Sequence, residues 1–529
     1  MIIAREWNRY KQQLEISYVD RQGNRQMFIR PMKRWKTYQY DENGLLDTWN
    51  GKKCIPVYKD ASTYSPNEFD ILEYIFDLEK NKSTANVLKD FYLHSPVNLF
   101  TYDIETEVSD EFPDPSIAAQ KITAISLVGP NMSCLVLGLK QMTVGQQKLL
   151  NERYQSFIKE NEFASLQADK SVSNGIPYPT CRYKYFATEH DLLRYWMMTI
   201  IPKIVFLAGW NSYGFDRTYI ENRCRRLFGQ DETTRMIKKA SPTYKIQRVS
   251  WLKNDDTYGE VHVPLHTMEF DYMELVKKYE YAFRPYESFS LDYCGSRIVG
   301  AHKIKYEGTL QQLYERDYEW YYYYNAIDSL IVQLIHKRTK CVNSPAAVGT
   351  VTLVGIEAAM GQIAMTTANL FRVFYDNNLH VVYDRNEVER VKKEFPGGFC
   401  AAVQDIHNWT ACFDFKSLYP TQIRTCNISF ENFIRPTVGP DSLGRYTPRE
   451  WTSQELDKFR ADPNYFVSVN NNVYKNDRKY AFKEMQEKNT VNRDKYKYLG
   501  QKINAQILSE LERLIKEKQS ENSIINDTK

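Results

Sequence analysis

Two acidic residues, Asp103 and Glu105, lie two positions apart at the end of an apolar run that begins at Phe100. Side chains two residues apart on a β-strand point to the same face. We therefore expect these carboxylates to project together, with Tyr102 and Ile104 on the opposite face. Divalent cations such as Mg²⁺ prefer oxygen ligands of this kind. On its own, however, such a pair is more often part of an acidic strand that faces solvent.

Two later segments also carry polar residues, one at the end of a predicted strand and one on a face of a predicted helix. Asn211 and Asp216 follow the apolar strand predicted at residues 203–208, and open α/β sheets bind ligands at such strand ends. Asn and Asp are also favoured in turns and helix caps. Tyr324 and Asp328 are four residues apart, so they share one face of a predicted helix and can reach a common water molecule. The order strand, strand end and helix favours one metal-dependent site over three unrelated features.

A further pair of segments lies in the last quarter of the chain. Residues 412–415, Cys-Phe-Asp-Phe, have the pattern of a buried β-strand, and residues 417–420, Ser-Leu-Tyr-Pro, are compatible with a turn into a helix. Arg493 and Lys497 are four residues apart and share one face of another predicted helix. Residues 475–518 contain 12 Lys or Arg and 7 Asp or Glu, so this region is locally basic. A solvated helix face is the alternative interpretation.

Length and composition favour a globular protein of several domains. The chain has 529 residues, of which 43% are hydrophobic and 26% charged, and about 150 residues per domain predicts three to four domains. The 70 Lys and Arg against 66 Asp and Glu give a net charge of +4, which excludes a histone-like polycation. The nine cysteines include no Cys-x-x-Cys pair, which argues against a zinc knuckle. Without a signal peptide or an apolar run of about 18 residues, we expect a cytosolic protein with no membrane partner.

The three acidic segments resemble the Exo I, Exo II and Exo III motifs of the DnaQ-like 3′–5′ exonuclease domain in family B DNA polymerases. The first segment is especially similar to that of the replicative polymerases of T-even-type bacteriophages. The resemblance implies two Mg²⁺ or Mn²⁺ ions held by the carboxylates of Asp103, Glu105, Asp216 and Asp328. It also implies that Tyr324 orients the attacking water. Lys303 lies at the separation from Asp328 at which this phage group has an active-site lysine, and Lys305 is the alternative.

Residues 414–420 resemble motif A of the same polymerases. The resemblance implies that Asp414 is a catalytic residue that binds the metal ions of a polymerase site. Tyr419 would pack under the deoxyribose of an incoming dNTP, and the backbone amides of residues 415–418 would bind its triphosphate. Arg493 and Lys497 resemble the basic residues of the first fingers helix. The residues implied to bind the dNTP are Ser417, Leu418, Tyr419, Arg493 and Lys497.

Two motifs that a complete polymerase of this family needs do not occur after Asp414. They are the Lys-x-x-x-Asn-Ser-x-Tyr-Gly of the second fingers helix and the Asp-Thr-Asp of the palm hairpin. We therefore expect DNA synthesis only with a second polymerase chain that carries them and that also binds the sliding clamp. A natural split is favoured over a truncated longer chain, although both remain open. Two other functions stay as alternatives: a stand-alone 3′–5′ exonuclease with a remnant palm, and a non-catalytic DNA-binding subunit.

The predicted fold class is a multidomain α/β and α+β protein with a β-rich N-terminal domain and an RNase H-like (DnaQ-like) exonuclease domain. A partial palm and a first fingers helix follow. The predicted boundaries are 1–98 for the N-terminal domain, with 341–380 returning to it, 99–340 for the exonuclease domain, 381–475 for the partial palm with motif A, and 476–529 for the fingers helix and C-terminal tail. The expected substrates are primer–template DNA and single-stranded 3′ ends in the cytoplasm of a bacterial host.

Three smaller features complete the predictions. Residues 251–261 have the pattern of a β-hairpin, which by resemblance separates primer from template during proofreading, and an ordinary exposed hairpin is the alternative. His262 and His266 are four residues apart, but Pro264 lies between them in a strand-like alternation, which argues against a metal-binding pair. Residues 395–398 resemble the turn that monitors DNA between nuclease and palm.

Overall fold

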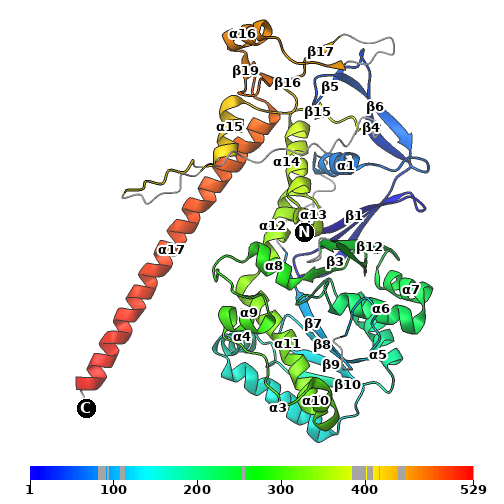
Figure 1. Ribbon diagram of the computed structural model, residues 1–529, viewed down its shortest axis with the longest axis vertical. Coiled ribbons are helices and arrows are strands. Elements are labelled where there is room, and N and C mark those ends of the chain that lie inside the picture. The colour runs from blue at the N-terminus through cyan, green and yellow to red at the C-terminus, as the bar shows by residue number, and fades with distance from the viewer. Residues whose placement is uncertain are drawn as a thin grey trace. The chain divides into compact units, whose positions relative to one another are not determined.

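In the computed structural model the described residues are 1–80, 91, 95–107, 113–252, 257–383, 401, 409–415, 417–438 and 447–527. They form two compact units that are interleaved in the sequence, with the elements labelled in Figure 1. The first unit contains Met1–Lys33 and Ile75–Met365, and the second contains Arg34–Tyr74 and Thr366–Lys529. The predicted domain boundaries do not map one to one onto these units and stay predictions. Within the described ranges, no helix has the length and apolar character that crossing a bilayer requires.

A six-stranded sheet lies at the centre of the first unit, with the strand order β10-β9-β8-β7-β11-β14. The strands are β7 (Leu99–Thr106), β8 (Ile122–Val128), β9 (Cys134–Gly138), β10 (Cys181–Tyr185), β11 (Phe206–Gly209) and β14 (Met268–Asp271). β7 pairs antiparallel with β8, whereas β7, β11 and β14 run parallel to one another. The carboxyl ends of these three parallel strands therefore point to the same edge of the sheet.

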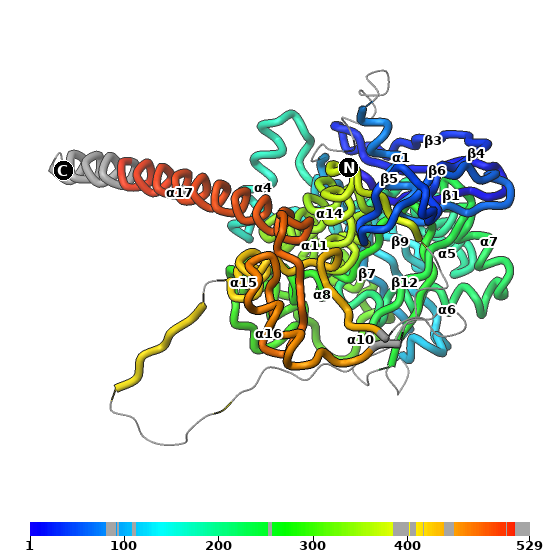
Figure 2. Tube along the Cα trace, turned by 90° about the horizontal axis from the view of Figure 1, so that it is seen from above, coloured from blue at the N-terminus to red at the C-terminus, as the bar shows by residue number. Residues whose placement is uncertain are grey.

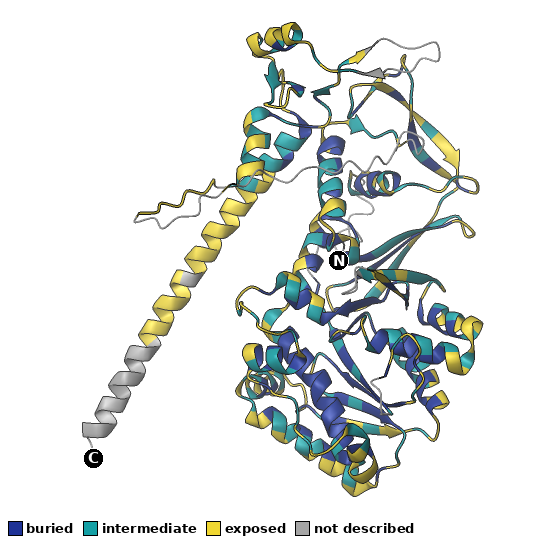
Figure 3. Cartoon of the chain, viewed as in Figure 1, coloured by how far each residue is buried: buried dark blue, intermediate teal, exposed yellow. Residues whose placement is uncertain are grey.

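Helices cover both faces of this sheet. Every residue of β8 is buried, as expected for a strand between two apolar layers. Ala124 belongs to the core that contains α11 (Tyr318–Thr339), and its neighbour Ile125 belongs to the core that contains α5 (Glu189–Tyr195) and α6 (Asp216–Phe228). Figure 3 shows α11 as a largely buried helix. This mixed α/β arrangement with a β-rich N-terminus is the fold class predicted from the sequence.

Other elements of the first unit surround this layered core. A small sheet of β1 (Ile2–Asn8), β2 (Gln13–Val19) and β3 (Arg25–Pro31) begins the chain. The predicted hairpin is confirmed, because β12 (Ile246–Leu252) pairs antiparallel with β13 (Tyr258–Pro264). The helices are α3 (Val144–Glu160), α4 (Glu162–Ser173), α7 (Gln230–Ala240), α8 (Tyr272–Tyr279), α9 (Leu291–Val299), α10 (Leu310–Arg316), α12 (Asn343–Thr352) and α13 (Ile356–Ala359), with a π-turn at Trp196–Ile200 and a 3₁₀ turn at Ile201–Lys203.

The segment that joins α12 to α13 lies directly against the first strand. A Cβ atom on Gly355 would be 2.5 Å from the carbonyl oxygen of Ile3, a distance that real side chains do not tolerate. Glycine is therefore required where these two backbones meet. This contact brings a part of the chain more than 350 residues from the N-terminus next to β1.

The second unit combines an N-terminal sheet with the last third of the chain. Its four-stranded sheet has the order β15-β5-β6-β4 and consists of β4 (Arg34–Tyr40), β5 (Leu46–Thr48), β6 (Lys53–Asp60) and β15 (Leu379–His380). α1 (Glu68–Lys80) and α14 (Gln362–Asp376) each cross a boundary between the units. The remaining elements are α15 (Leu418–Cys426), β16 (Phe433–Ile434), β17 (Thr437–Val438), β18 (Thr447–Pro448), α16 (Ser453–Ala461), β19 (Tyr465–Val467), β20 (Val473–Lys475) and α17 (Ala481–Asp527).

The 47-residue helix α17 contains Arg493 and Lys497, which the sequence places on one helix, and it continues to Asp527, where the sequence predicts a tail. α15 lies beside the beginning of α17 in both views (Figures 1 and 2). Further along, α17 exposes apolar side chains, among them Leu499, Ile503 and Ile507.

Candidate active site

The strand β7 presents two carboxylates to one side of the central sheet. Asp103 and Glu105 alternate with Tyr102 and Ile104, which are buried in the core beside α5 and α6. Glu105 is only 9% exposed to solvent, and Asp103 is half-buried. The period of two expected for a strand therefore places both acidic side chains on the face opposite this apolar pair, as predicted.

Asp216 reaches β7 from the first residue of α6. Its Oδ1 accepts a hydrogen bond of 3.1 Å from the backbone N–H of Ile104, which lies between the two β7 acids. The turn from β11 to α6 is held by Asp271, at the end of β14. The Asp271 carboxylate accepts hydrogen bonds from the backbone N–H groups of Asn211 (3.1 Å) and Tyr213 (3.3 Å). The parallel strands β11 and β14 thus position Asp216, because both end beside this turn.

The helix α11 supplies Tyr324 and Asp328, and the segment between α9 and α10 supplies Lys303. The buried Asp328 forms an ion pair with Lys303, with 2.7 Å between Nζ and Oδ2. Lys303 Nζ also donates a hydrogen bond to the hydroxyl of Tyr324 at 3.0 Å. Lys305 is exposed and does not line this region, so the geometry favours Lys303. Asn325, which the sequence did not single out, donates from Nδ2 to Asp103 Oδ2 at 2.8 Å.

Three of the carboxylates are close enough to share one cation. One oxygen each of Asp103, Glu105 and Asp328 lies within 4.8 Å of the others. Among the described residues, Oδ1 of Asp328 is buried without a hydrogen-bond partner. A buried acceptor without a donor is unfavourable unless another positive group binds it. This all-oxygen donor set fits hard divalent cations such as Mg²⁺ or Mn²⁺.

Burial and mutual repulsion shift the pKa values of these acids upward. Burial, followed by the negative charges of Asp216 and Asp328, raises the pKa of Asp103 well above its ordinary range. Burial is also the main cause that raises the pKa of Glu105 to about 8 and that of Asp216 to about 7. Burial alone would lower the pKa of Lys303, but the charge of Asp328 raises it above the ordinary value, so Lys303 stays charged. One lysine does not offset four carboxylates, and the site therefore favours added positive charge.

The carboxylates open into a cleft of about 1070 Å³ in the first unit. Aromatic side chains form much of its wall. The aromatic residues that line it are Trp210, Tyr213, Phe215, Trp251, Phe289 and Tyr324. The charged residues that line it are Asp103, Glu105, Asp114, Asp216, Asp271, Glu274, Lys277, Lys303 and Asp328. The cleft therefore combines a carboxylate cluster that could hold cations with several aromatic side chains.

Comparison with known protein families finds a match for residues 56–294. The model of the family described as "DNA polymerase family B, exonuclease domain" matches residues 56–294, which include Asp103, Glu105 and Asp216. Residues 56–294 are therefore similar to the exonuclease domain of family B DNA polymerases. This match confirms the resemblance stated from the motifs and the RNase H-like fold class. Tyr324 and Asp328 lie beyond the matched residues.

Two curated proteins similar to this chain are phage enzymes. The chain is 28% identical to the "DNA-directed DNA polymerase" of Escherichia phage RB69 over 346 residues, which cover 64% of this chain and 36% of that protein. It is 29% identical to the "DNA-directed DNA polymerase" of Enterobacteria phage T4 over 437 residues, which cover 78% of this chain and 45% of that protein. The chain thus matches less than half the length of either relative.

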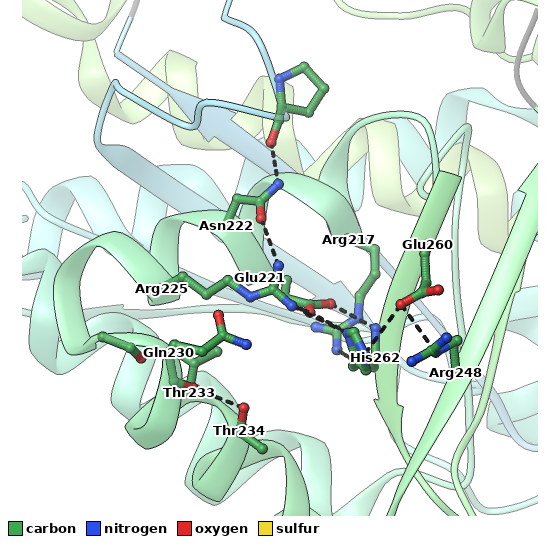
Figure 4. Close-up of polar contacts among 12 residues, drawn as sticks. Arg217, Glu221, Asn222, Arg225, Gln230, Thr233, Thr234, Arg248, Glu260 and His262 are labelled. Atoms are coloured by element: carbon green, nitrogen blue, oxygen red, sulfur yellow. Dashed lines mark hydrogen bonds and ion pairs between the residues drawn. The ribbon is translucent and has the colours of Figure 1, made fainter. Parts of the chain in front are cut away.

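Within the exonuclease domain, a polar network joins α6 to the hairpin strand β13 (Figure 4). The buried Glu221 accepts a hydrogen bond from the backbone N–H of His262 at 2.8 Å, and its other oxygen lies 2.8 Å from His262 Nδ1. Arg225 also contacts Glu221, and Arg217 donates to the carbonyl oxygen of His262. His266, the other histidine considered in the sequence, contacts the hydroxyls of Ser17 and Thr243 instead. The network fixes the hairpin on the helix that begins with Asp216.

The residues that the sequence predicts to form motif A belong to the second unit. Asp414 and Tyr419 are exposed, and Ser417 precedes the first residue of α15, Leu418. Arg493 on α17 donates to the Ser417 hydroxyl at 3.3 Å, so two of the predicted nucleotide-binding residues meet. Lys497 is exposed on the same helix.

The predicted buried strand at residues 412–415 is wrong for the described structure. This segment has no regular secondary structure, and Phe413 is 92% exposed. Apolar side chains form a strand only beside a hydrogen-bonding neighbour, and none of the described strands pairs with this segment. The predicted DNA-monitoring turn at residues 395–398 lies outside the described residues.

Proposed function

We propose that this chain removes nucleotides from the 3′ ends of DNA strands by hydrolysis. The observation that carries the proposal is the convergence of four carboxylates, Lys303 and Tyr324 in one open cleft of a family B exonuclease domain. A structural role alone gives no reason to bury four acids with a single lysine, because their repulsion is costly in a folded protein.

The side chains have distinct roles in this proposal. Two divalent cations, Mg²⁺ or Mn²⁺, would be held by Asp103, Glu105, Asp216 and Asp328 and would supply charge stabilisation to the phosphoryl oxygens. Tyr324 would orient the attacking water through its hydroxyl. Lys303 keeps that hydroxyl in place, since it donates to it at 3.0 Å, and carries a positive charge beside the developing phosphate charge. Asn325 would hold Asp103 in the orientation needed for cation binding.

The test is digestion of a single-stranded oligonucleotide in the presence of Mg²⁺ by the wild-type chain and by an Asp103→Ala/Glu105→Ala variant. We expect the variant to lose activity by several orders of magnitude while it remains folded. Asp169→Ala is a matched control, because it removes an exposed acid from α4 that does not line the cleft. Comparable digestion by the double variant would contradict the assignment.

We also propose that the second unit contributes half of a DNA polymerase site. Asp414 would bind the metal ions of that site, and Ser417, Leu418, Tyr419, Arg493 and Lys497 would bind the dNTP. The hydrogen bond between Arg493 and Ser417 supports this grouping. Synthesis would need the palm Asp-Thr-Asp motif and the second fingers motif, which do not occur in these 529 residues, and the polypeptide that carries them would also bind the sliding clamp. Primer–template DNA in the host cytoplasm would be the substrate.

A mixing experiment tests this second proposal. The chain is combined with candidate polypeptides that carry the missing motifs, and primer extension and 3′ digestion are measured with Mg²⁺. We expect digestion by the chain alone and extension only in a productive mixture, with extension abolished by Asp414→Ala. Efficient extension by the isolated chain would contradict the incomplete-site argument. Digestion without extension in every mixture would instead favour a stand-alone exonuclease.

A further inference from the structure

Two glutamates lie directly opposite each other in the small sheet that begins the chain. Glu6 on β1 pairs with Glu15 on β2, so the two side chains share one face of the sheet. Like charges at such opposite positions destabilise a sheet. Glu15 is only 1% exposed, so water screens its charge little. The pair therefore favours a cation from elsewhere.

The segments that flank the hairpin β12–β13 bring two further groups to this pair. Lys245, just before β12, has its Nζ 2.8 Å from Glu6 Oε1 and 3.7 Å from Glu15 Oε2. His266 follows β13, and one atom each of Glu6, Glu15 and His266 lies within 4.8 Å of the others. All four residues belong to the first unit, and none of them lines the carboxylate cleft. They form a second, separate cluster.

The lysine leaves part of the negative charge in this cluster without a donor. Oε1 of Glu15 accepts hydrogen bonds from the side chains of Asn8 (2.8 Å) and Gln13 (2.6 Å). Oε2 of Glu15 and Oε2 of Glu6 are buried and have no hydrogen-bond partner among the described residues. Such an oxygen is unfavourable unless a positive group binds it. One ammonium, closest to Glu6, does not satisfy both carboxylates.

The imidazole of His266 is suited to be a ligand. Its Nδ1 lies 2.7 Å from the hydroxyl of Ser17, and its Nε2 lies 3.0 Å from the hydroxyl of Thr243. Burial, followed by the positive charge of Arg25, lowers the pKa of His266 to about 4, so the ring is neutral at pH 7. A ligating histidine usually donates from its second ring nitrogen to an acceptor, which one of these hydroxyls would provide.

We propose that Glu6, Glu15 and His266 form a binding site for a divalent transition-metal cation such as Zn²⁺. One imidazole nitrogen and two carboxylate oxygens are ligands that Zn²⁺ accepts, and a water molecule would complete four-coordination. The side chain of Lys245 is 26% exposed, so its ammonium has a path to solvent when the cation binds. The cation would join β1 and β2 to the segments that flank the hairpin. This inference does not depend on the nuclease proposal.

The test measures Zn²⁺ binding by calorimetry with the Asp103→Ala/Glu105→Ala chain, which lacks two carboxylates of the other cluster. In this background His266→Ala and Glu6→Gln should each weaken Zn²⁺ binding by about tenfold or more. Glu6→Gln keeps the shape of a half-buried side chain, so it tests the site where His266→Ala fails to fold. His190→Ala is the matched control and should leave the affinity unchanged, because His190 is exposed and outside the cluster.

A Lys245→Met variant distinguishes a cation site from an ordinary ion pair. Loss of the competing ammonium should strengthen Zn²⁺ binding by about tenfold or more, whereas a purely structural ion pair predicts no gain. Co²⁺ should give the visible absorption of a four-coordinate site, and His266→Ala should abolish it. The site would be overturned by an absence of saturable Zn²⁺ binding. Unchanged affinity in Glu6→Gln or in folded His266→Ala, or no gain in Lys245→Met, would overturn it as well.

Discussion

Replacing Glu105 by Gln should stabilise the metal-free protein while it abolishes cation-dependent activity. Burial, together with the charges of neighbouring acids, raises the pKa of Glu105 from 4.5 to about 8. Between these two values the folded state holds a proton on Glu105 that the unfolded state has released, so folding becomes less favourable as the pH rises. Glutamine has the same shape and no charge, and it removes this dependence.

The size of the effect follows from the same two values. Each pH unit between 4.5 and 8 costs about 1.4 kcal/mol, so at pH 7 the Glu105→Gln chain should be about 3 kcal/mol more stable as an upper estimate. Below pH 4.5 the carboxyl is protonated in both states, and the difference should disappear. Above pH 8 it should reach its largest value, because both states are then ionised.

Denaturant unfolding of the first unit, measured in EDTA at pH 5, 7 and 8, gives these free energies directly. Adding Mg²⁺ should stabilise the wild-type chain more than the variant, because a ligand stabilises only the state that binds it. A difference between wild type and variant that is the same at pH 5 and pH 8 would refute the account of a repulsive, buried carboxylate cluster.

Three further predictions follow from the site. Lys303→Met should reduce kcat by at least tenfold, because the Asp328 carboxylate loses the ammonium that lies 2.7 Å from it. Lys305→Met should leave kcat unchanged, because Lys305 is exposed. A steady-state assay in which Lys305→Met lowers kcat and Lys303→Met does not would contradict the placement of Lys303. Asp271→Ala should destabilise the first unit by about 2 kcal/mol and lower kcat, since two backbone N–H groups of the turn before α6 lose their acceptor. Equal Tm and kcat values for the wild-type chain and this variant would show that Asp271 does not hold the turn. Mg²⁺ affinity, measured by calorimetry, should rise between pH 6 and pH 8 as Glu105 releases its proton, and a flat profile would show that no proton is displaced.

The motif residues of the site could be predicted from the sequence because their spacing is set by local geometry. Asp103 and Glu105 share a strand face, and Tyr324 and Asp328 share a helix face, so period and position predict each pair. The resemblance to the exonuclease motifs then joined the pairs into one site. The choice between Lys303 and Lys305 could not be made in this way, since both lie in a segment without regular structure. Only the fold shows which ammonium reaches Asp328.

Other residues were missed because their role depends on neighbours distant in the sequence. Asp271 acts on the backbone of a turn some 60 residues earlier, and Asn325 orients Asp103 more than 200 residues away. The signals available were modest: Asp271 ends the buried strand β14 and caps α8, and Asn325 lies one turn before Asp328. The strand expected at residues 412–415 failed for the related reason that an apolar pattern does not specify a pairing neighbour.

The most direct test of the central claim is the direction and metal dependence of DNA digestion by the 529-residue chain. A single-stranded oligonucleotide labelled at its 5′ end is incubated with the protein in Mg²⁺ or in EDTA, and the products are separated by length over time. The proposed nuclease function predicts a ladder that shortens from the 3′ end one nucleotide at a time in Mg²⁺, with no products in EDTA or with Asp103→Ala/Glu105→Ala. Absence of digestion by the wild-type chain in Mg²⁺ and Mn²⁺, or an unchanged ladder with the double variant, would contradict it.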